Sequence, residues 1–203
     1  MADLVLCETF RGPALDPRLR WFCEPGGWRI EPSTPALVVE PDGETDFWQR
    51  THYGFQADNG HFLYVEVPGD FAITTHVRVR PANQYDQAGL MVRLSSGCWL
   101  KTSVEHEIGM PAQLGAVVTN GGYSDWSVQD YTEPHIDLHL RVTRAGADYV
   151  VEHSRDGVAW RMIRVAHLRA DDGGAEVACG LYACSPKGAG MLAEFMHLSV
   201  ERA

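Results

Sequence analysis

Two neighbouring segments of the chain alternate strictly between two kinds of residue, and this period of two most constrains how the chain can fold. In residues 85–94, one side of the pattern is aliphatic and the other mixed: Ala88, Leu90, Val92 and Leu94 against Gln87, Met91 and Arg93. In residues 99–105, the same alternation separates Leu100, Thr102 and Val104 from Trp99, Lys101, Ser103 and Glu105. Because alternate side chains of a strand point to opposite faces of a sheet, both segments predict strands with one core face.

Short segments of the same type recur along the chain, separated by turn residues. Further strands are expected at residues 37–39, 62–67, 71–80, 116–119, 136–142, 148–153, 160–165, 177–183 and 193–200. Residues 10–36 are rich in Pro and Gly, which favours extended segments and turns anchored by Trp21, Trp28 and Ile30. One helical turn is expected within residues 166–174.

Ten or more short strands without a long amphipathic helix predict an all-β fold, an antiparallel sandwich or barrel. With 203 residues, one sandwich domain accounts for the whole of residues 1–203, with residues 1–14 open to a peripheral position.

Charge and composition exclude several classes of function. The formal net charge of −10 lacks the basic surface that a nucleic-acid partner requires. The first residues lack the features of a signal peptide, so none is expected, and no apolar run is long enough to span a membrane. Five cysteines without CxxC spacing indicate free thiols, so a cytoplasmic protein is expected: Cys7, Cys23, Cys98, Cys179 and Cys184.

The polar face of residues 99–107 is the first candidate site. An aromatic ring, an ammonium and a carboxylate from Trp99, Lys101 and Glu105 together favour a polar ligand. Glu105 with Glu107 or Asp86 forms a weaker candidate pair of acid and base for glycoside hydrolysis, which uses two carboxyl groups about 5–10 Å apart. The alternative is a solvated strand face without a ligand.

Two further segments mix aromatic and polar residues. The segment 45–61 contributes Asp46, Trp48, Tyr53 and His61, a combination that suits a sugar because an aromatic ring covers its C–H face. Alternatively, its aromatic residues pack into an edge of the sandwich. Residues 120–127 indicate a Gly-rich loop whose Trp126 either closes over the site or fills the core.

Metal and cofactor sites are not expected. The carboxylates near residues 120–127 lack the DxDxDG spacing of a calcium loop. His135 and His139 lie about 13 Å apart on an extended strand, too far for one zinc ion. No nucleophile elbow, P-loop or dinucleotide motif is present, so no cofactor is predicted.

Several motifs in order resemble those of the "regulation of enolase protein" family, of unknown function, within the concanavalin A-like lectin/glucanase superfamily. They are Trp21 to Trp28, Thr45 to Trp48, Asp58 to His61, Tyr85 to Val92, Trp99 to Lys101 with Glu105, and Val117 to Ser127. The pattern in residues 71–93 is also similar to the accessory sandwich domain of some bacterial β-xylosidases. This resemblance implies a jelly roll of two antiparallel sheets, one of them concave. Laminarinase-type hydrolases of this superfamily carry a catalytic Glu-x-Asp-x-Glu motif on one strand. This chain lacks the motif and has the shorter, differently spaced Glu105-His106-Glu107 instead.

These observations predict a cytoplasmic, non-catalytic sandwich that binds a carbohydrate or a small polar or anionic metabolite on its concave face. The expected ligand-binding residues are Asp46, Trp48, Tyr53, His61, Gln87, Arg93, Trp99, Lys101, Glu105 and Trp126. Two alternatives stay open. One is an enzyme that uses Glu105 with Glu107 or Asp86, and the other is a protein-interaction module that acts on a metabolic enzyme.

Overall fold

The computed structural model describes residues 3–202, and all regular structure within them is β-strand. The strands are β1 Asp3–Glu8, β2 Arg20–Phe22, β3 Gly27–Glu31, β4 Ala36–Glu40, β5 Phe47–Gln49, β6 Gln56–Asp58, β7 His61–Pro68, β8 Phe71–Arg80, β9 Gln87–Ser95, β10 Cys98–Glu105, β11 Ala112–Asn120, β12 Tyr123–Tyr131, β13 Ile136–Ala145, β14 Asp148–Ser154, β15 Arg161–His167, β16 Glu176–Cys184 and β17 Leu192–Arg202. Over this range no helix is long and apolar enough to cross a membrane.

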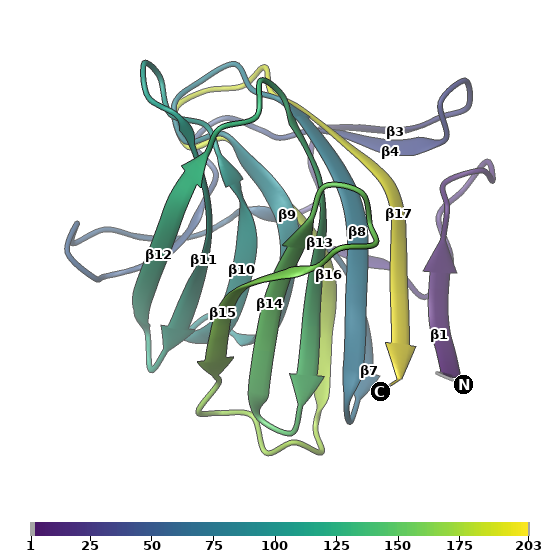
Figure 1. Cartoon of the computed structure of the whole chain (residues 1–203), viewed down its shortest axis with the longest axis vertical. Coiled ribbons are helices and arrows are strands. Elements are labelled where there is room, and N and C mark those ends of the chain that lie inside the picture. The colour runs from purple at the N-terminus through teal and green to yellow at the C-terminus, as the bar shows by residue number, and fades with distance from the viewer. Residues whose placement is uncertain (1–2, 203) are drawn as a thin grey trace.

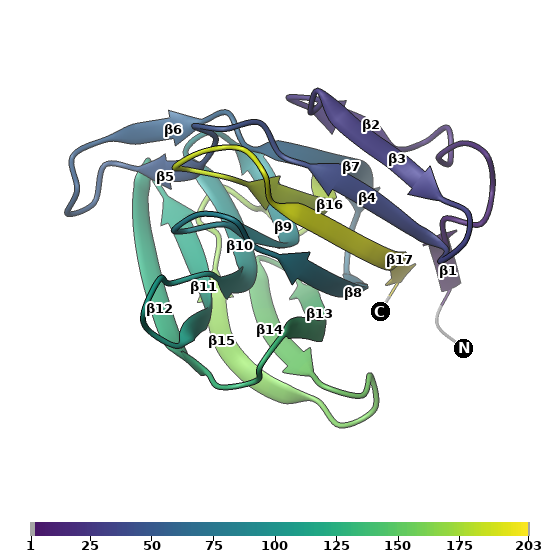
Figure 2. The same ribbon diagram turned by 90° about the horizontal axis from the view of Figure 1, so that it is seen from above.

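The strands build two large antiparallel sheets that lie face to face (Figures 1 and 2). One sheet has the order β15-β14-β13-β8-β17-β4-β3, with β1 added beside β17, and the other has the order β12-β11-β10-β9-β16-β7-β2. The short strands β5 and β6 pair only with each other. The predicted all-β, concanavalin A-like jelly-roll sandwich is confirmed.

The aliphatic faces of the strands meet between the sheets and form the main core. Ala88, Leu90 and Val92 of β9 and Leu100 and Val104 of β10 are completely buried there, as their alternation predicts. The partly buried side chains that pack against this core include the expected anchors Trp21, Trp28 and Ile30. The opposite face of β9 and β10 is left for a second, smaller cluster of buried side chains.

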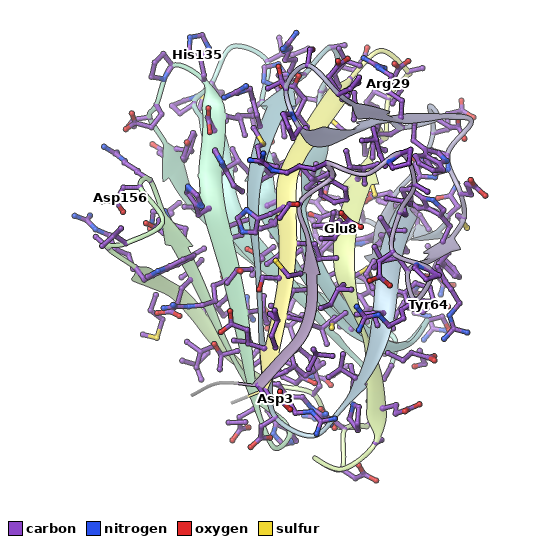
Figure 3. The ribbon with its side chains drawn as sticks, turned by 90° about the vertical axis from the view of Figure 1, so that its right-hand side faces the viewer. Asp3, Glu8, Arg29, Tyr64, His135 and Asp156 are labelled. Atoms are coloured by element: carbon purple, nitrogen blue, oxygen red, sulfur yellow. The ribbon has the colours of Figure 1, made fainter. Side chains whose placement is uncertain are left out.

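The first strand of the chain is tied to the last. A bulge between Phe195 and His197 divides β17, whose first part pairs with β4 and whose second part pairs with β1. Figure 3 shows β1 beside β17, running from Asp3 to Glu8. Leu6 and Phe10 are buried in the main core, so this segment contributes to the packing of the sandwich.

Two local expectations are wrong. The expected loop at 120–127 is a two-residue turn of Gly121 and Gly122, both with positive φ, followed directly by β12. Glycine adopts this conformation without a steric penalty, which makes a tight hairpin possible. Residues 168–175 contain no helical turn. They form an irregular loop held by the buried ion pair between Arg144 and Asp171.

A row of three imidazoles crosses the outer face of the sheet that contains β8. His76 on β8 lies beside His139 on β13 and His197 on β17, and the His76 and His139 rings stack with centroids 4.2 Å apart. Burial, together with the neighbouring charges of His139 and His76, lowers the pKa of His197 to about 4. His135, four residues before His139, is exposed and lies outside this row, and residues 3–202 hold no metal-ligand cluster.

This row is expected to make the fold sensitive to acid. Between pH 6.5 and about 4, the unfolded chain protonates His197 more readily than the folded chain, so the free energy of unfolding falls as the pH falls. We expect His197→Asn to reduce the stability lost between pH 7 and pH 5 by about 1 kcal/mol, after allowance for solvent screening. Urea unfolding at the two pH values measures this difference. The control His135→Asn, at an exposed site, should lose as much stability between pH 7 and pH 5 as the wild type. If His197→Asn also loses as much as the wild type, the prediction is contradicted.

Candidate functional site

The concave face of the β12-β11-β10-β9 region carries the polar residues that the alternation places there. In one row across the strands, Lys101 lies between Met91 and Val117, with Trp126 next on β12. In a second row, Glu105 pairs in register with Gln87 on β9 and with Gln113 on β11. The sheet thus presents an ammonium and a carboxyl group on one face, four residues apart on β10.

The β5–β6 hairpin lies over one end of this face and changes what is accessible. Phe47 of β5 packs against Trp99 and Tyr182, with ring centroids 6.2 and 6.4 Å away. Trp99 is therefore completely buried, and its indole N–H donates to the backbone carbonyl of Ser96. The expectation that Trp99 is open to a ligand is wrong, because the hairpin occupies the space above its ring.

Beside the hairpin the concave face opens into a cavity of about 370 Å³. Seven of the ten residues expected to bind a ligand line it: Asp46, Trp48, Tyr53, Gln87, Lys101, Glu105 and Trp126. The β5–β6 hairpin and the segment before it supply Asp46, Trp48 and Tyr53, and the sheet supplies the other four. The lower end of the usual volume range of ligand pockets is about 300 Å³, so the cavity suits a ligand of about one sugar ring.

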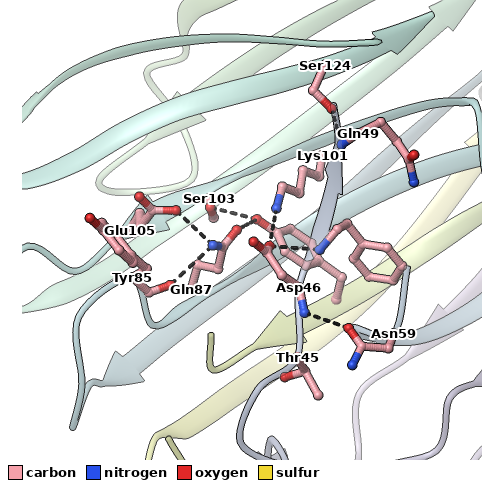
Figure 4. Close-up of polar contacts among 12 residues, drawn as sticks. Thr45, Asp46, Gln49, Asn59, Tyr85, Gln87, Lys101, Ser103, Glu105 and Ser124 are labelled. Carbon is pink, nitrogen blue, oxygen red and sulfur yellow. Dashed lines mark hydrogen bonds and ion pairs between the residues drawn. The ribbon is translucent and has the colours of Figure 1, made fainter. Parts of the chain in front are cut away.

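Lys101 forms an ion pair in the wall of this cavity. Its ammonium nitrogen lies 3.0 Å from Oδ1 of Asp46, and the Lys101 side chain is almost completely buried (Figure 4). The backbone N–H of Phe47 also donates to Oδ1 of Asp46, and Asn59 Oδ1 accepts from the Asp46 N–H. Burial alone lowers the pKa of Lys101, but the nearby acidic groups, with Asp46 first, outweigh it and raise that pKa. Lys101 is therefore a cation held rigidly in position.

Glu105 ends a chain of hydrogen bonds that runs across three strands (Figure 4). The Gln87 amide donates to Oε2 of Glu105 at 2.8 Å and to the carbonyl of Tyr85 at 3.2 Å. The Gln87 carbonyl oxygen lies 3.1 Å from the hydroxyl of Tyr182, which lies 2.7 Å from that of Ser103. This chain fixes the orientation of the Gln87 amide and leaves Oε1 of Glu105 without a side-chain partner among residues 3–202.

The environment of Glu105 favours the neutral carboxylic acid. Burial raises its pKa, Lys101 opposes this effect, and the charges of Asp46 and Glu107 add to it, giving a value of about 8. A carboxyl group with such a pKa is protonated at neutral pH and can donate a hydrogen bond into the cavity. Groups with strongly shifted pKa values in a cavity are typical of functional sites.

Replacement of Glu105 by glutamine is expected to stabilise the fold at alkaline pH. Ionisation of Glu105 is harder in the folded chain than in the unfolded chain, so the wild type loses stability as the pH rises from 4.5 to about 8. We expect Glu105→Gln to be about 2 kcal/mol more stable than the wild type at pH 8 and equal to it at pH 5, after discounting for screening. Denaturant unfolding at both pH values measures this difference. A variant less stable than the wild type at pH 8 would contradict the prediction.

Three expected ligand-binding residues lie outside the cavity, and each has a structural partner instead. The Nδ1–H of His61 donates to the carbonyl of Cys23, and its Nε2 accepts from the backbone N–H of Asp42. Arg93 forms a two-point ion pair with Asp58, at 2.8 and 2.9 Å. Trp99 is the third, beneath the hairpin.

Of the candidate catalytic partners of Glu105, Asp86 lies outside the cavity and Glu107 lines it. Asp86 is completely buried, and its Oδ2 accepts from the backbone N–H groups of Ala82 and Asn83 at 2.7 Å. It stabilises the turn before β9 and does not line the cavity. Glu107 does line the cavity and bonds to the amide of Gln84.

Sequence reasoning missed several residues of the cavity wall. Phe55 and Tyr85 supply aromatic surface at its mouth, and Pro186 and Lys187 come from the segment after β16. The Lys187 ammonium lies 5.6 Å from the centre of the Tyr85 ring. Only the aromatic density of residues 47–55 gave a signal for Phe55. Nothing in the pattern of residues 184–192 indicates that this segment reaches the cavity.

With this geometry in place, comparison with known proteins identifies the family. A family described as "Protein of unknown function (DUF1349)" matches residues 21–203. The chain belongs to this family. It is 38% identical over 180 residues to "Regulation of enolase protein 1" of Saccharomyces cerevisiae, covering 86% of this chain and 88% of the yeast protein. The resemblance suggested by the sequence motifs is confirmed.

Solved structures agree on the fold. The crystal structure of a functionally unknown protein from Saccharomyces cerevisiae matches with a TM-score of 0.83 at 34% identity, covering 92% of this chain and 97% of that chain. The GH43 protein BlXynB of Bacillus licheniformis matches with a TM-score of 0.74 at 16% identity, covering 97% of this chain but only 39% of that chain. At this identity the second match shows a shared sandwich fold and carries no function.

Proposed function

We propose that this protein is a non-catalytic binding protein that holds a carbohydrate or another small polar or anionic metabolite in the cavity on its concave face. The observation that carries the proposal is the pairing of a buried cation, Lys101, with a carboxyl group of raised pKa, Glu105, in one cavity with aromatic walls. Polar groups buried at a cavity are costly to desolvate, so a ligand that satisfies them is bound selectively.

The aromatic residues support a ligand with a C–H face. Trp48 and Tyr53 pack together with ring centroids 5.4 Å apart, and Trp126 lines the cavity from β12. An aromatic ring of this kind covers apolar ligand surface, while the polar floor takes up hydroxyl or anionic groups.

Thermal unfolding in the presence of a panel of neutral sugars, sugar acids and sugar phosphates tests the proposal. A panel member at about 100 times its dissociation constant should add about 2.7 kcal/mol of stability. We expect Trp126→Ala to weaken binding about tenfold, which corresponds to about 1.4 kcal/mol. The matched control Trp160→Ala, on the opposite sheet over Arg141, should leave binding unchanged. No stabilisation by any panel member would overturn the proposal.

A second panel, of glycosides, separates binding from catalysis. An enzyme acting on glycosides requires Glu105 together with Glu107, since Asp86 is committed to the turn before β9. In that case a panel of glycosides is hydrolysed, and Glu105→Gln abolishes the turnover. Binding without turnover supports the binding protein.

A second candidate function rests on the name of the yeast relative, which describes regulation of enolase. We propose on this basis that the chain also contacts a metabolic enzyme of this class. Purified enolase should then bind the protein in analytical ultracentrifugation, and the cavity variant Trp126→Ala should leave that binding intact. Absence of a complex at micromolar concentrations of both proteins would exclude this function.

We further propose a reducing compartment, such as the cytoplasm. All five cysteines are free thiols, and Cys98, Cys179 and Cys184 are buried. Such a distribution suits a compartment in which disulfides do not form.

A further inference from the structure

Both lysines of the chain line the same cavity. The sequence contains Lys101 and Lys187 and no other lysine, whereas all its other basic side chains of fixed charge are arginines. Lys101 lies in the floor on β10, and Lys187 lies at the mouth, on the segment after β16. Two compact cations that approach one small cavity from separate parts of the chain indicate that the ligand carries negative charge.

Two of the three N–H donors of the Lys101 ammonium have no hydrogen-bond partner among residues 3–202. Asp46 is its one hydrogen-bond partner among residues 3–202, although an ammonium carries three N–H donors. Lys101 and Glu105 form no ion pair with each other, and both line the cavity. A buried ammonium with unused donors is costly unless a ligand satisfies them.

Glu105 lines the same cavity, four residues after Lys101 on β10. The charged and titratable groups around it are Lys101 and Glu107 on its own segment, Asp46 before β5, Tyr182 and Cys184 on β16, Lys187 beyond β16 and Asp130 behind Gln113. Among these groups, the charge of Lys101 lowers the pKa of Glu105. Burial and the charges of Asp46 and Glu107 raise this pKa by more. Glu105 therefore presents an O–H donor at neutral pH, so the cavity wall offers one donor from Glu105 and one from Lys101 to a bound ligand.

On the basis of the proposed function, we infer that the ligand is a hydroxylated monocarboxylic acid, such as a sugar acid, whose carboxylate accepts hydrogen bonds from Lys101 and from the carboxylic acid of Glu105. The ligand enters as the anion, and Glu105 carries a solvent-derived proton in the complex. One negative charge matches the donors in the floor. The second charge of a phosphate group would lie near Glu107, which repels it.

Isothermal titration calorimetry with matched pairs tests this assignment. The probes are D-glucuronate against D-glucose, D-galacturonate against D-galactose, and D-gluconate and glucose 6-phosphate as further anions. At least one of the three acids is expected to bind at least tenfold more tightly than the neutral sugars at pH 7. Because Glu105 must keep its proton, the affinity for that acid should fall about tenfold between pH 7 and pH 9.

Two variants assign the effects to their residues. Lys101→Met should lose at least tenfold in affinity for the acid, and in Glu105→Gln the change in affinity between pH 7 and pH 9 should disappear. The control Glu66→Gln, at a carboxylate that pairs with Arg20 on the edge strand β2, should keep the tenfold change.

The outcomes separate this inference from the proposed function. Neutral sugars or glucose 6-phosphate binding as tightly as every acid, or an acid affinity independent of pH in the wild type, would overturn the inference and leave the binding function in place. Absence of binding by every probe would overturn both.

Discussion

Replacement of Asp171 by alanine is expected to lower the free energy of unfolding by about 3–5 kcal/mol, because it leaves the buried guanidinium of Arg144 without its counter-ion. The Asp171 carboxylate receives two N–H groups of Arg144, the hydroxyl of Tyr149 and the N–H of Gly173. Arg144 is completely buried and also donates to the carbonyls of Gly69 and Ala175. Because Arg144 donates to the carbonyl of Gly146 as well, the ion pair joins three separate loops at the end of the sandwich.

Urea unfolding at pH 7 measures this loss. The neighbouring Asp172→Ala is the matched control, because Asp172 is exposed and accepts only the N–H groups of Gly174 and Ala175. It should cost about 1 kcal/mol, the value of ordinary hydrogen bonds. Equal losses in the two variants would show that the loop conformation, and not the ion pair with Arg144, carries the stability.

The alternation of the sequence predicts which face of the sheet each residue occupies. Lys101 and Glu105 lie on the concave face, and Leu100 and Val104 lie in the core, as their spacing requires. Periodicity says nothing about what covers a face. Trp99 is on the predicted side of β10 but buried, because a hairpin fifty residues earlier in the chain folds over it.

The other features that the sequence did not predict are an edge strand and contacts between distant segments of the chain. The edge strand β12 is largely exposed on both faces, so residues 123–131 lack the alternation of apolar and polar residues that identifies an interior strand. The contacts that decide the site, between Lys101 and Asp46 and between Lys187 and Tyr85, join segments far apart in the sequence. Local patterns contain no information about such pairs. The aromatic and polar density of residues 45–55 nevertheless indicated a segment that lines the cavity.

Replacement of Asp46 by asparagine is expected to cost about 3 kcal/mol of stability, because it leaves the ammonium of Lys101 buried and unpaired. Asparagine keeps an oxygen that can accept from the N–H of Phe47, so the loss reports mainly the missing charge. Urea unfolding of the single variant and of the double variant Asp46→Asn/Lys101→Met measures how much of that loss comes from the unpaired cation.

The double variant is expected to recover at least half of the stability lost in the single variant, since removal of both charges also removes the desolvation cost of burying them. A buried ion pair that the fold can lose so cheaply is retained for a reason other than stability. The proposed function gives ligand recognition as that reason, so the double variant is expected to be well folded and unable to bind. A double variant as unstable as Asp46→Asn alone would instead assign the pair to the architecture of the hairpin.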